Sequence, residues 1–284
     1  SLATNGIRFT SAYVTGPVCG PSRAGLMSGR YQQRFGFEFN LGASGGGMSQ
    51  RETTFADRMK AAGYKTGMVG KWHLGYTKPL QPTSRGFEWF YGFLPACRSY
   101  NCRPGEMGTS VFGSKDEKPR YTSDVFASEA AAFIEQNRDK PWFLYLAFNA
   151  VHASPQGGKK LIPQDAGKYA ERFPNVAPEQ RRIFAGMLAG LDAGVGTVLT
   201  KLRDLKIEEN TLVFFFSDNG GPTWQTTSRN DPLRGCKGDV LEGGIREPFI
   251  VQWKGRLPAG KTDDRPIISL DILPTALAAA GQTA

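Results

Sequence analysis

Hydrophobic positions along the chain follow two patterns, which predict an alternation of helices and strands. Four helices are predicted, at residues 53–62, 123–137, 178–205 and 271–280. The longest of them has apolar residues spaced three and four apart. Four strands are predicted, most from continuous apolar runs, at residues 64–69, 142–148, 211–216 and 249–253. This alternation indicates an α/β fold with a largely parallel central sheet sandwiched by helices.

Glycine and proline mark the segments between these elements. The chain has 35 Gly and 18 Pro, and their density over residues 76–120 predicts long surface loops there. No repeat and no low-complexity linker divides the 284 residues, of which 40% are hydrophobic. We therefore expect one domain with a sizeable core rather than a disordered chain.

Charge and cysteine content narrow the classes of partner. The formal charge of +9 favours anionic partners such as nucleic acids, sulfated or phosphorylated polymers, or acidic membranes. Nucleic acid is not expected, because the chain has neither a Lys/Arg block nor a nucleic-acid module. We expect no membrane span. Four cysteines are too few for a disulfide scaffold, although Cys97 and Cys102 could either pair or remain free thiols.

Reactive side chains follow three of the predicted strands. The chain has only two histidines: His73, with Lys71, follows one strand, and His152 follows a second. Asp218 and Asn219 follow a third strand. Ligands of open α/β sheets bind beyond the carboxyl ends of the strands. These side chains are therefore expected to converge on one site.

Two loops offer ligand-binding groups whose interpretation stays open on sequence alone. Asp218 and Asn219 place two oxygen donors on a Gly-rich turn, which suits Ca²⁺ or Mg²⁺, but such a turn can also bond only to its own backbone. Lys237 lies with Arg234 in a Gly-containing loop. That loop could grip an anion or be an ordinary solvated turn.

Cys19 is a candidate nucleophile. Pro21 suits an early helical position, so Cys19 is expected at the start of a helix. A helix N-terminus and the nearby Arg23 would both stabilise a thiolate. The alternative is a small buried cysteine at a turn.

Five segments, taken in order, resemble the sulfatase family, whose fold is alkaline-phosphatase-like. They are Cys19–Arg30, similar to the signature that directs conversion of cysteine to formylglycine, Gly70–Gly75, Val151–Ala153, Ser217–Gly221 and Leu233–Pro248. The likeness extends over nearly the whole chain.

This resemblance implies a maturation step and a nucleophile. Cys19 would be oxidised by a formylglycine-generating enzyme, and the hydrated aldehyde would supply the attacking hydroxyl. Arg23 would hold this diol. Asp218 and Asn219 would be ligands of Ca²⁺, or of Mg²⁺. The family begins with a strand that ends in paired aspartates and closes with a smaller subdomain, so we expect residues 1–284 to be a single sulfatase catalytic domain, incomplete at both ends.

The resemblance also implies roles for the remaining polar residues. Lys71, His152 and Lys237 would bind the sulfate group, with His152 as the acid toward the leaving alcohol. His73 would act as the base when sulfate is expelled. Histidine suits both proton transfers, because its ordinary pKa is about 6.5.

The function implied is hydrolysis of a sulfuric ester. The substrate would be a sulfated small molecule or polysaccharide, most consistent with a carbohydrate, and the location would be periplasmic, secreted or lysosomal. Two alternatives remain: a degenerate domain that binds anions without turnover, and a phosphodiesterase or phosphonate hydrolase of the same superfamily.

Overall fold

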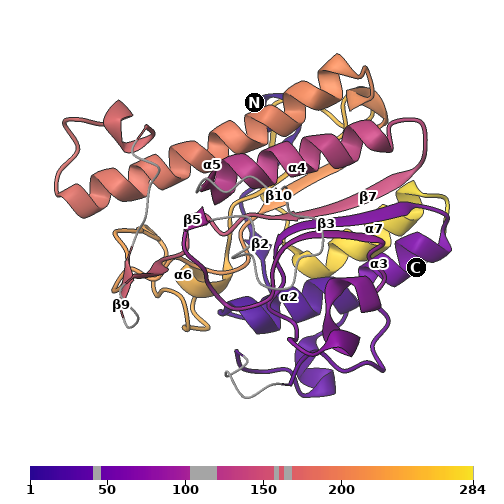
Figure 1. Cartoon of the computed structure of the whole chain (residues 1–284), viewed down its shortest axis with the longest axis horizontal. Coiled ribbons are helices and arrows are strands. Elements are labelled where there is room, and N and C mark those ends of the chain that lie inside the picture. Colours follow the sequence, from indigo (N-terminus) through magenta and orange to yellow (C-terminus); the bar gives the residue numbers. More distant parts are fainter. Residues whose placement is uncertain (41–45, 103–119, 157–159, 163–167, 284) are drawn as a thin grey trace.

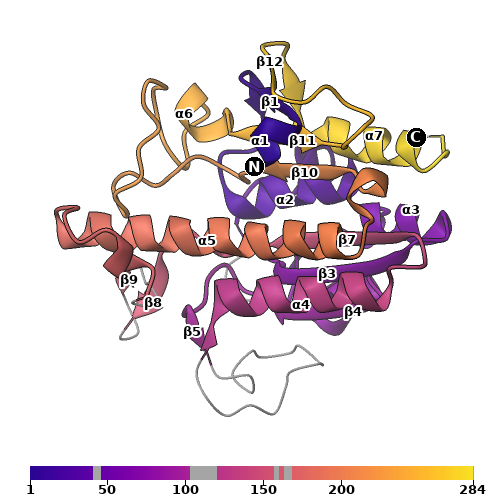
Figure 2. The same ribbon diagram turned by 90° about the horizontal axis from the view of Figure 1, so that it is seen from above.

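The fold is α/β, as predicted, with helices on both sides of the strands (Figure 1). The computed structural model describes residues 1–40, 46–102, 120–156, 160–162 and 168–283. One helical layer contains α4 (Thr122–Gln136) and α5 (Glu179–Asp204), which lie side by side in both ribbon views (Figure 2). The opposite layer contains α2 (Cys19–Ser28), α3 (Phe55–Ala61) and α7 (Ile272–Ala279).

A parallel three-stranded sheet carries two of the predicted strand ends. Its order is β4 (Trp89–Phe93), β3 (Lys65–Lys71) and β7 (Trp142–Ala147). Because all three strands run the same way, their carboxyl ends meet at one edge. Strand β4 was not predicted, since residues 76–120 were expected to be loops. Four of its five residues are buried, but the Gly- and Pro-rich segments around the strand obscured so short an apolar run.

A second sheet of four strands has mixed direction. Its order is β10 (Val213–Phe216), β11 (Phe249–Gln252), β1 (Ile7–Phe9) and β12 (Lys261–Asp263). Strand β11 is antiparallel to both neighbours, whereas β1 and β12 are parallel. The other α-helices and strands among the described residues are short: α1 (Leu2–Asn5), α6 (Glu242–Ile245) and the strand pairs β2 (Ala12–Tyr13) with β13 (Ile267–Ile268), β5 (Asn101–Cys102) with β6 (Arg120–Tyr121), and β8 (Ser154–Gln156) with β9 (Lys160–Ile162).

Local sequence explains where the helices begin and end. Thr54 precedes α3 and forms a capping box with Asp57: the Thr54 hydroxyl accepts from the Asp57 N–H at 3.0 Å, and the Asp57 carboxylate accepts from the Thr54 N–H at 2.9 Å. Helix α2 ends at Gly29, whose φ of +65° suits a residue without a side chain. Pro178 and Leu205 flank α5, as predicted.

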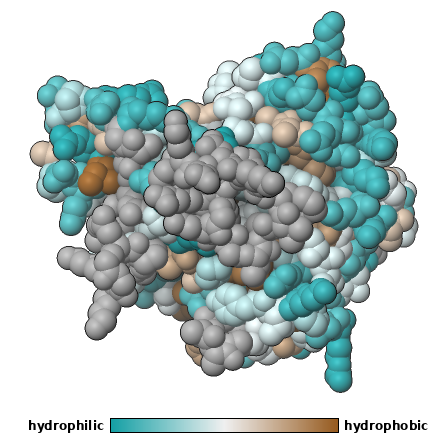
Figure 3. Space-filling model, in the orientation of Figure 1, coloured by the Kyte–Doolittle hydropathy of each residue, from teal (hydrophilic) through white to brown (hydrophobic). Residues whose placement is uncertain are grey.

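The core lies on both faces of the sheets. The larger cluster packs the sheets against α2, α3 and α7, and includes Met27, Phe55, Trp72, Phe90 and Leu273. Smaller clusters pack α4 and α5 against the opposite face. The described surface seen in Figure 3 is mainly hydrophilic, with hydrophobic residues scattered over it.

A cavity of about 1610 Å³ follows the edges of β7 and β10. Within the described residues, each of these strands pairs with only one neighbour, β3 and β11 respectively. Apolar side chains of β7, β10 and α5 line much of the cavity, for example Leu144, Phe215 and Val198. Its polar lining includes Arg23 and Lys71, so the cavity reaches the predicted site.

Against the expectation from sequence, α5 is long and apolar enough to cross a membrane by length and composition. One face of this helix packs on α4 and contributes to an apolar cluster with β7 and β10. Core helices of globular domains pass the same criterion, so this one helix is weak evidence for a membrane span.

Candidate active site

Cys19 is the first residue of α2, as predicted, and only 2% of it is exposed. Val18 precedes the helix in an extended conformation and gives no side-chain cap. Asn40 caps it from a distant loop instead: its side-chain oxygen accepts the Gly20 N–H at 2.8 Å. The thiol therefore lies at the positive end of a ten-residue helix.

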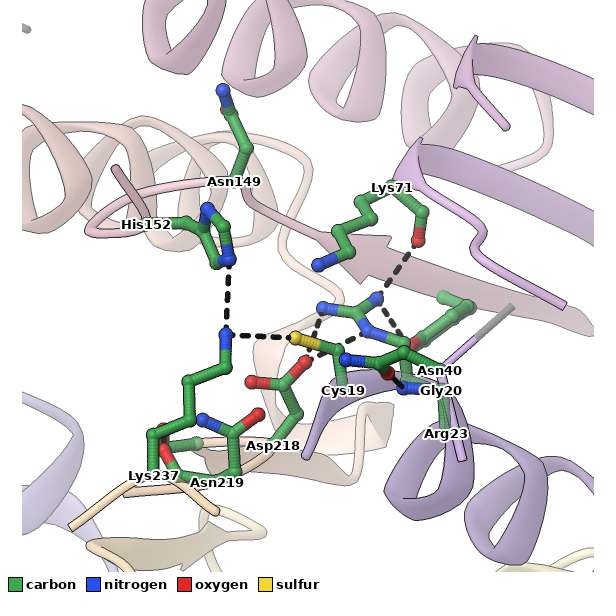
Figure 4. Close-up of polar contacts among 12 residues, drawn as sticks. Cys19, Gly20, Arg23, Asn40, Lys71, Asn149, His152, Asp218, Asn219 and Lys237 are labelled. Carbon is green, nitrogen blue, oxygen red and sulfur yellow. Dashed lines mark hydrogen bonds and ion pairs between the residues drawn. The ribbon is translucent and has the colours of Figure 1, made fainter. Parts of the chain in front are cut away.

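Two cationic side chains and one imidazole point toward Cys19 (Figure 4). Lys237 Nζ lies 3.2 Å from Cys19 Sγ and 3.0 Å from His152 Nε2. Lys71 is the last residue of β3 and is 1% exposed, and its ammonium has no hydrogen-bond partner in the described part of the chain. Cys19, Lys71, His152 and Lys237 thus come from four separate segments to one point.

The surrounding groups stabilise a thiolate. Burial alone would raise the pKa of Cys19, but the charge of Lys71, contacts with His152 and His73, and the charge of Lys237 outweigh it. Together they hold the pKa of Cys19 well below its usual value. A pocket that favours negative charge on this sulfur would also favour an anionic group bound beside it.

The ring of His152 is held in one orientation by its neighbours. Its Nδ1 lies 2.6 Å from the Ala153 carbonyl, so Nδ1 carries the proton that is donated to this oxygen. In the neutral ring, Nε2 then accepts the hydrogen bond from Lys237. This atom is the part of His152 that faces the pocket (Figure 4).

His73 lies just beyond β3 in an unusual backbone conformation, with a φ of +63°. Its N–H donates to the Leu94 carbonyl at 2.9 Å, which continues the pairing of β3 with the β4 side. The ring is buried, and neither nitrogen has a hydrogen-bond partner within the described residues. Burial lowers the pKa of His73, while interaction with the Cys19 thiol opposes that shift. A neutral ring with unpaired nitrogens can accept a proton.

Arg23 joins Cys19's helix to the two sheets. Its guanidinium donates to Asp218 and to the Lys71 carbonyl, both at 2.8 Å, and to the Tyr145 hydroxyl at 3.0 Å. Burial acts against its charge, but Tyr145 and Asp218 outweigh this and raise the pKa of Arg23. Arg23 is therefore a charged link between the Cys19 helix and the strand ends.

The turn after β10 presents two oxygen-bearing side chains. Asn219 is 8% exposed, and its Oδ1 has no partner within the described residues, whereas its Nδ2 donates to the Gly220 carbonyl at 2.9 Å. Asp218 lies beside it and shares one oxygen with Arg23. An orphaned amide oxygen next to a carboxylate fits one side of a Ca²⁺ or Mg²⁺ site. A calcium ion takes about six to eight oxygen ligands, so other groups must complete it.

The turn after β10 and the loop of Lys237 are in close backbone contact at three glycines. These are Gly220, Gly243 and Gly244, which we call the glycine seam. A Cβ on Gly220 would lie 1.9 Å from the Gly243 carbonyl oxygen, and one on Gly243 would lie 2.2 Å from the Gly235 oxygen. The Gly220 N–H donates to the Gly244 carbonyl at 3.0 Å. The backbones therefore touch where any side chain would separate them.

Four residues of the site were not predicted. They are Asn40, Tyr100, Tyr145 and Glu247. Glu247 is 8% exposed, and burial, with a smaller contribution from the charge of Asp218, raises its pKa to about 8. Tyr145 could have been suspected, because it lies on the half-buried strand β7, which leads toward His152. Of the two cysteines considered for pairing, Cys97 is a free thiol in the structure.

Fold and site together define a pocket with a buried thiol at a helix start and lysine side chains beside it. The family model described as Sulfatase matches residues 1–282. The chain belongs to the sulfatase family, and its fold is the alkaline-phosphatase-like fold of that family.

Named relatives agree with this assignment. Human arylsulfatase A is 35% identical over 315 residues, which cover 99% of this chain and 58% of that protein. N-acetylgalactosamine-6-sulfatase of Canis lupus familiaris is 33% identical, covering 99% and 56%. The crystal structure of Ps i-CgsB in complex with k-i-k-neocarrahexaose has a TM-score of 0.89 and 34% identity, covering all of this chain and 66% of that one. The chain thus spans a little over half the length of the two curated relatives.

Proposed function

We propose that residues 1–284 belong to one catalytic domain that hydrolyses sulfuric esters. A single observation carries the proposal: Lys237 Nζ lies within hydrogen-bond distance of both Cys19 Sγ, at 3.2 Å, and His152 Nε2, at 3.0 Å. A cation and an imidazole held over a nucleophilic position are what cleavage of a charged ester requires.

In this proposal the sulfur of Cys19 marks the position of the reacting oxygen. Formylglycine formed from Cys19 would supply, once hydrated, both the attacking hydroxyl and a second hydroxyl whose loss of a proton expels sulfate. Lys71 and Lys237 would bind the sulfate oxygens and offset their charge. Their placement at the positive end of α2 adds to this stabilisation.

Proton transfer is assigned to the two histidines. His152, in its doubly protonated form, would deliver a proton to the leaving alcohol oxygen from Nε2, the atom that faces Lys237, and would be left with the proton on Nδ1. His73 would take a proton from the Cys19 side of the pocket, which suits its buried and unpaired ring nitrogens. Arg23 would fix the relative positions of α2, β3 and Asp218.

A divalent cation fits the turn after β10. Asp218 and Asn219 would hold Ca²⁺, or Mg²⁺, which would lower the energy of negative charge on the bound sulfate. The described residues offer these two side chains, and further ligands would have to come from water, substrate or other groups.

The substrate is proposed to be a sulfated carbohydrate. Two relatives support this class: one is named N-acetylgalactosamine-6-sulfatase, and another was solved with k-i-k-neocarrahexaose. The formal charge of +9 favours an anionic substrate. By analogy with the sulfatase family, we propose that the protein works in the periplasm, outside the cell or in the lysosome.

The decisive experiment is turnover by a matured sample. The chain, coexpressed with a formylglycine-generating enzyme, should show by intact mass that Cys19 is converted. It should then release sulfate from 4-nitrophenyl sulfate in the presence of Ca²⁺. Cys19→Ala should abolish this release, and Cys236→Ala, which alters another cysteine, should retain it.

The same assay separates the alternatives. A folded, formylglycine-bearing protein that binds sulfate in calorimetry but releases none from the ester would be an anion-binding domain. Faster cleavage of an aryl phosphodiester than of the aryl sulfate would indicate a phosphodiesterase. Either result would refute the proposed activity.

A further inference from the structure

The turn that carries His152 is contacted by the hydroxyl of one buried tyrosine, Tyr100. Tyr100 directly precedes β5, and its side chain is fully buried. The Tyr100 hydroxyl lies 2.6 Å from the Asn149 carbonyl oxygen and 2.8 Å from the His152 carbonyl oxygen. One hydroxyl thus faces both ends of the four-residue turn that follows β7.

These contacts define the shape of the turn. The His152 N–H donates to the Asn149 carbonyl at 2.8 Å, which closes the turn. Because the hydroxyl has one proton, it is shared between two carbonyl oxygens that would otherwise repel each other. Burial raises the pKa of Tyr100 well above its usual value, so the proton stays in place.

Tyr100 is itself held firmly. Its ring stacks on Tyr121 with centroids 5.5 Å apart, and its carbonyl accepts the Thr122 N–H at 2.8 Å. The Thr122 hydroxyl donates to the Asn149 side-chain oxygen at 3.0 Å. The start of α4 and Tyr100 therefore hold the same turn through its backbone and one side chain.

The orientation of the His152 ring depends on this backbone. Nδ1 of His152 is tied to the carbonyl of the next residue, Ala153, at 2.6 Å, so a rotation of the turn would move the ring with it. Nε2 is then directed to Lys237, which in turn reaches Cys19. A chain of contacts leads from Tyr100 to the reacting position, although Tyr100 touches neither Lys237 nor Cys19 by any of these bonds.

We propose that Tyr100 is a positioning residue for His152, whose hydroxyl keeps the turn 149–152 in the shape that directs Nε2 into the pocket. This inference rests on the proposed function for its kinetic consequence, but its structural part can be tested without activity. A correctly placed acid matters most when the leaving alcohol is a poor leaving group. Tyr100→Phe should therefore slow hydrolysis of esters of weakly acidic alcohols selectively.

The kinetic test compares two substrates on formylglycine-bearing protein. General acid catalysis contributes about 10²–10⁴-fold, so partial misplacement should lower kcat for a sugar sulfate about tenfold. For 4-nitrophenyl sulfate, whose leaving group needs little protonation, kcat should fall no more than about twofold. Equal losses on both substrates would overturn the inference, because a merely structural defect reduces the active fraction for every substrate alike.

The second test measures the tautomer of the His152 imidazole directly, by ¹⁵N NMR of histidine-labelled protein. With only two histidines, a His73→Gln sample assigns both rings. The wild type should show the Nδ1–H tautomer of His152, and Tyr100→Phe should show a mixture of tautomers. An unchanged tautomer in Tyr100→Phe would overturn the inference even if the wild type hydrolyses no sulfate, which would instead count against the proposed function.

Two further variants test whether the effect of Tyr100→Phe comes from its bonds to the turn 149–152 or from the loss of any tyrosine hydroxyl. Thr122→Val keeps the side-chain shape but removes the bond to Asn149, and it should shift both readouts in the same direction by less. Tyr64→Phe removes a phenol oxygen from a partly buried tyrosine of another cluster and should behave as the wild type. Equal effects of Tyr64→Phe and Tyr100→Phe would contradict the proposed role.

Discussion

Lys71 is an ammonium group in a setting that disfavours its charge. The side chain is 1% exposed, and burial lowers its pKa; the charges of Cys19 and Asp218 oppose this shift, whereas those of Arg23 and Lys237 act in the same direction as burial. A buried cation whose ammonium has no hydrogen-bond partner in the described residues costs folding free energy, which indicates a purpose other than stability. Binding an anion would supply the missing partner.

Replacement of Lys71 by methionine should therefore separate activity from stability. We expect Lys71→Met to lower kcat/KM for an aryl sulfate at least about 100-fold, since loss of one buried charge contact costs about 3 kcal/mol. The melting temperature should stay the same or rise, because the buried charge is gone. A large fall in melting temperature would mean that Lys71 supports the fold rather than the substrate.

The unmodified thiol of Cys19 offers a second test at the residue scale. Because the pKa of Cys19 is held well below its usual value, alkylation should proceed at lower pH than for an ordinary thiol. Lys237→Met removes one lowering charge, so the midpoint of the alkylation profile should move to higher pH. The rate is followed by mass spectrometry after iodoacetamide treatment at each pH.

The control for Lys237→Met is a lysine that lies away from Cys19. Lys254 pairs with Glu208 at 3.2 Å, and Lys254→Met should leave the alkylation midpoint in place. If Lys237→Met and Lys254→Met gave the same midpoint as the wild type, the close contact with Cys19 would have no electrostatic effect.

The charged residues that sequence reasoning selected lie close together in the structure, but the tyrosines and Asn40 that hold them were not predicted. Cys19, Lys71 and Lys237 stand in segments whose order and composition are distinctive. Tyr100 and Tyr145 stand in segments that look ordinary, and their importance comes from what their hydroxyls meet in the folded chain. Contacts between residues far apart in sequence leave no local signal.

At the scale of elements, helices were easier to predict than strands. The apolar spacing of α5 and the capping threonine of α3 are local, so their ends were placed within a residue or two. Strand β4 was missed because its pairing with β3 is not encoded in its own five residues. The antiparallel placement of β11 between β10 and β1 likewise depends on the whole sheet.

The glycine seam makes a prediction about the loops that it joins. Gly220→Ala places a Cβ against the backbone of Gly243 and should destabilise the chain by at least about 2 kcal/mol in urea unfolding. Gly196→Ala is the matched control: this position lies within α5 with open space around it, so alanine should stabilise by about 0.5–1 kcal/mol. Destabilisation of similar size by both would contradict the close backbone contact.

At the scale of the molecule, charge predicts how polymeric substrates approach. Lys and Arg exceed Asp and Glu by 35 to 26, and a net positive molecule attracts a polyanion over several ångströms. We expect kcat/KM on a sulfated polysaccharide to fall about tenfold between about 20 and 300 mM salt, as the Debye length shortens. For a monosulfated sugar the fall should be no more than about threefold. Equal salt dependence would mean that only local charges act.

The burial of Cys19 sets the timing of its maturation under the proposed function. The residue is 2% exposed, and Lys237, which lies over its sulfur, is 218 positions further along the chain. During translation, the segment around Cys19 emerges long before the loop that covers it. An enzyme that oxidises this cysteine would therefore have access while the polypeptide is still growing, and the finished fold would then exclude that enzyme.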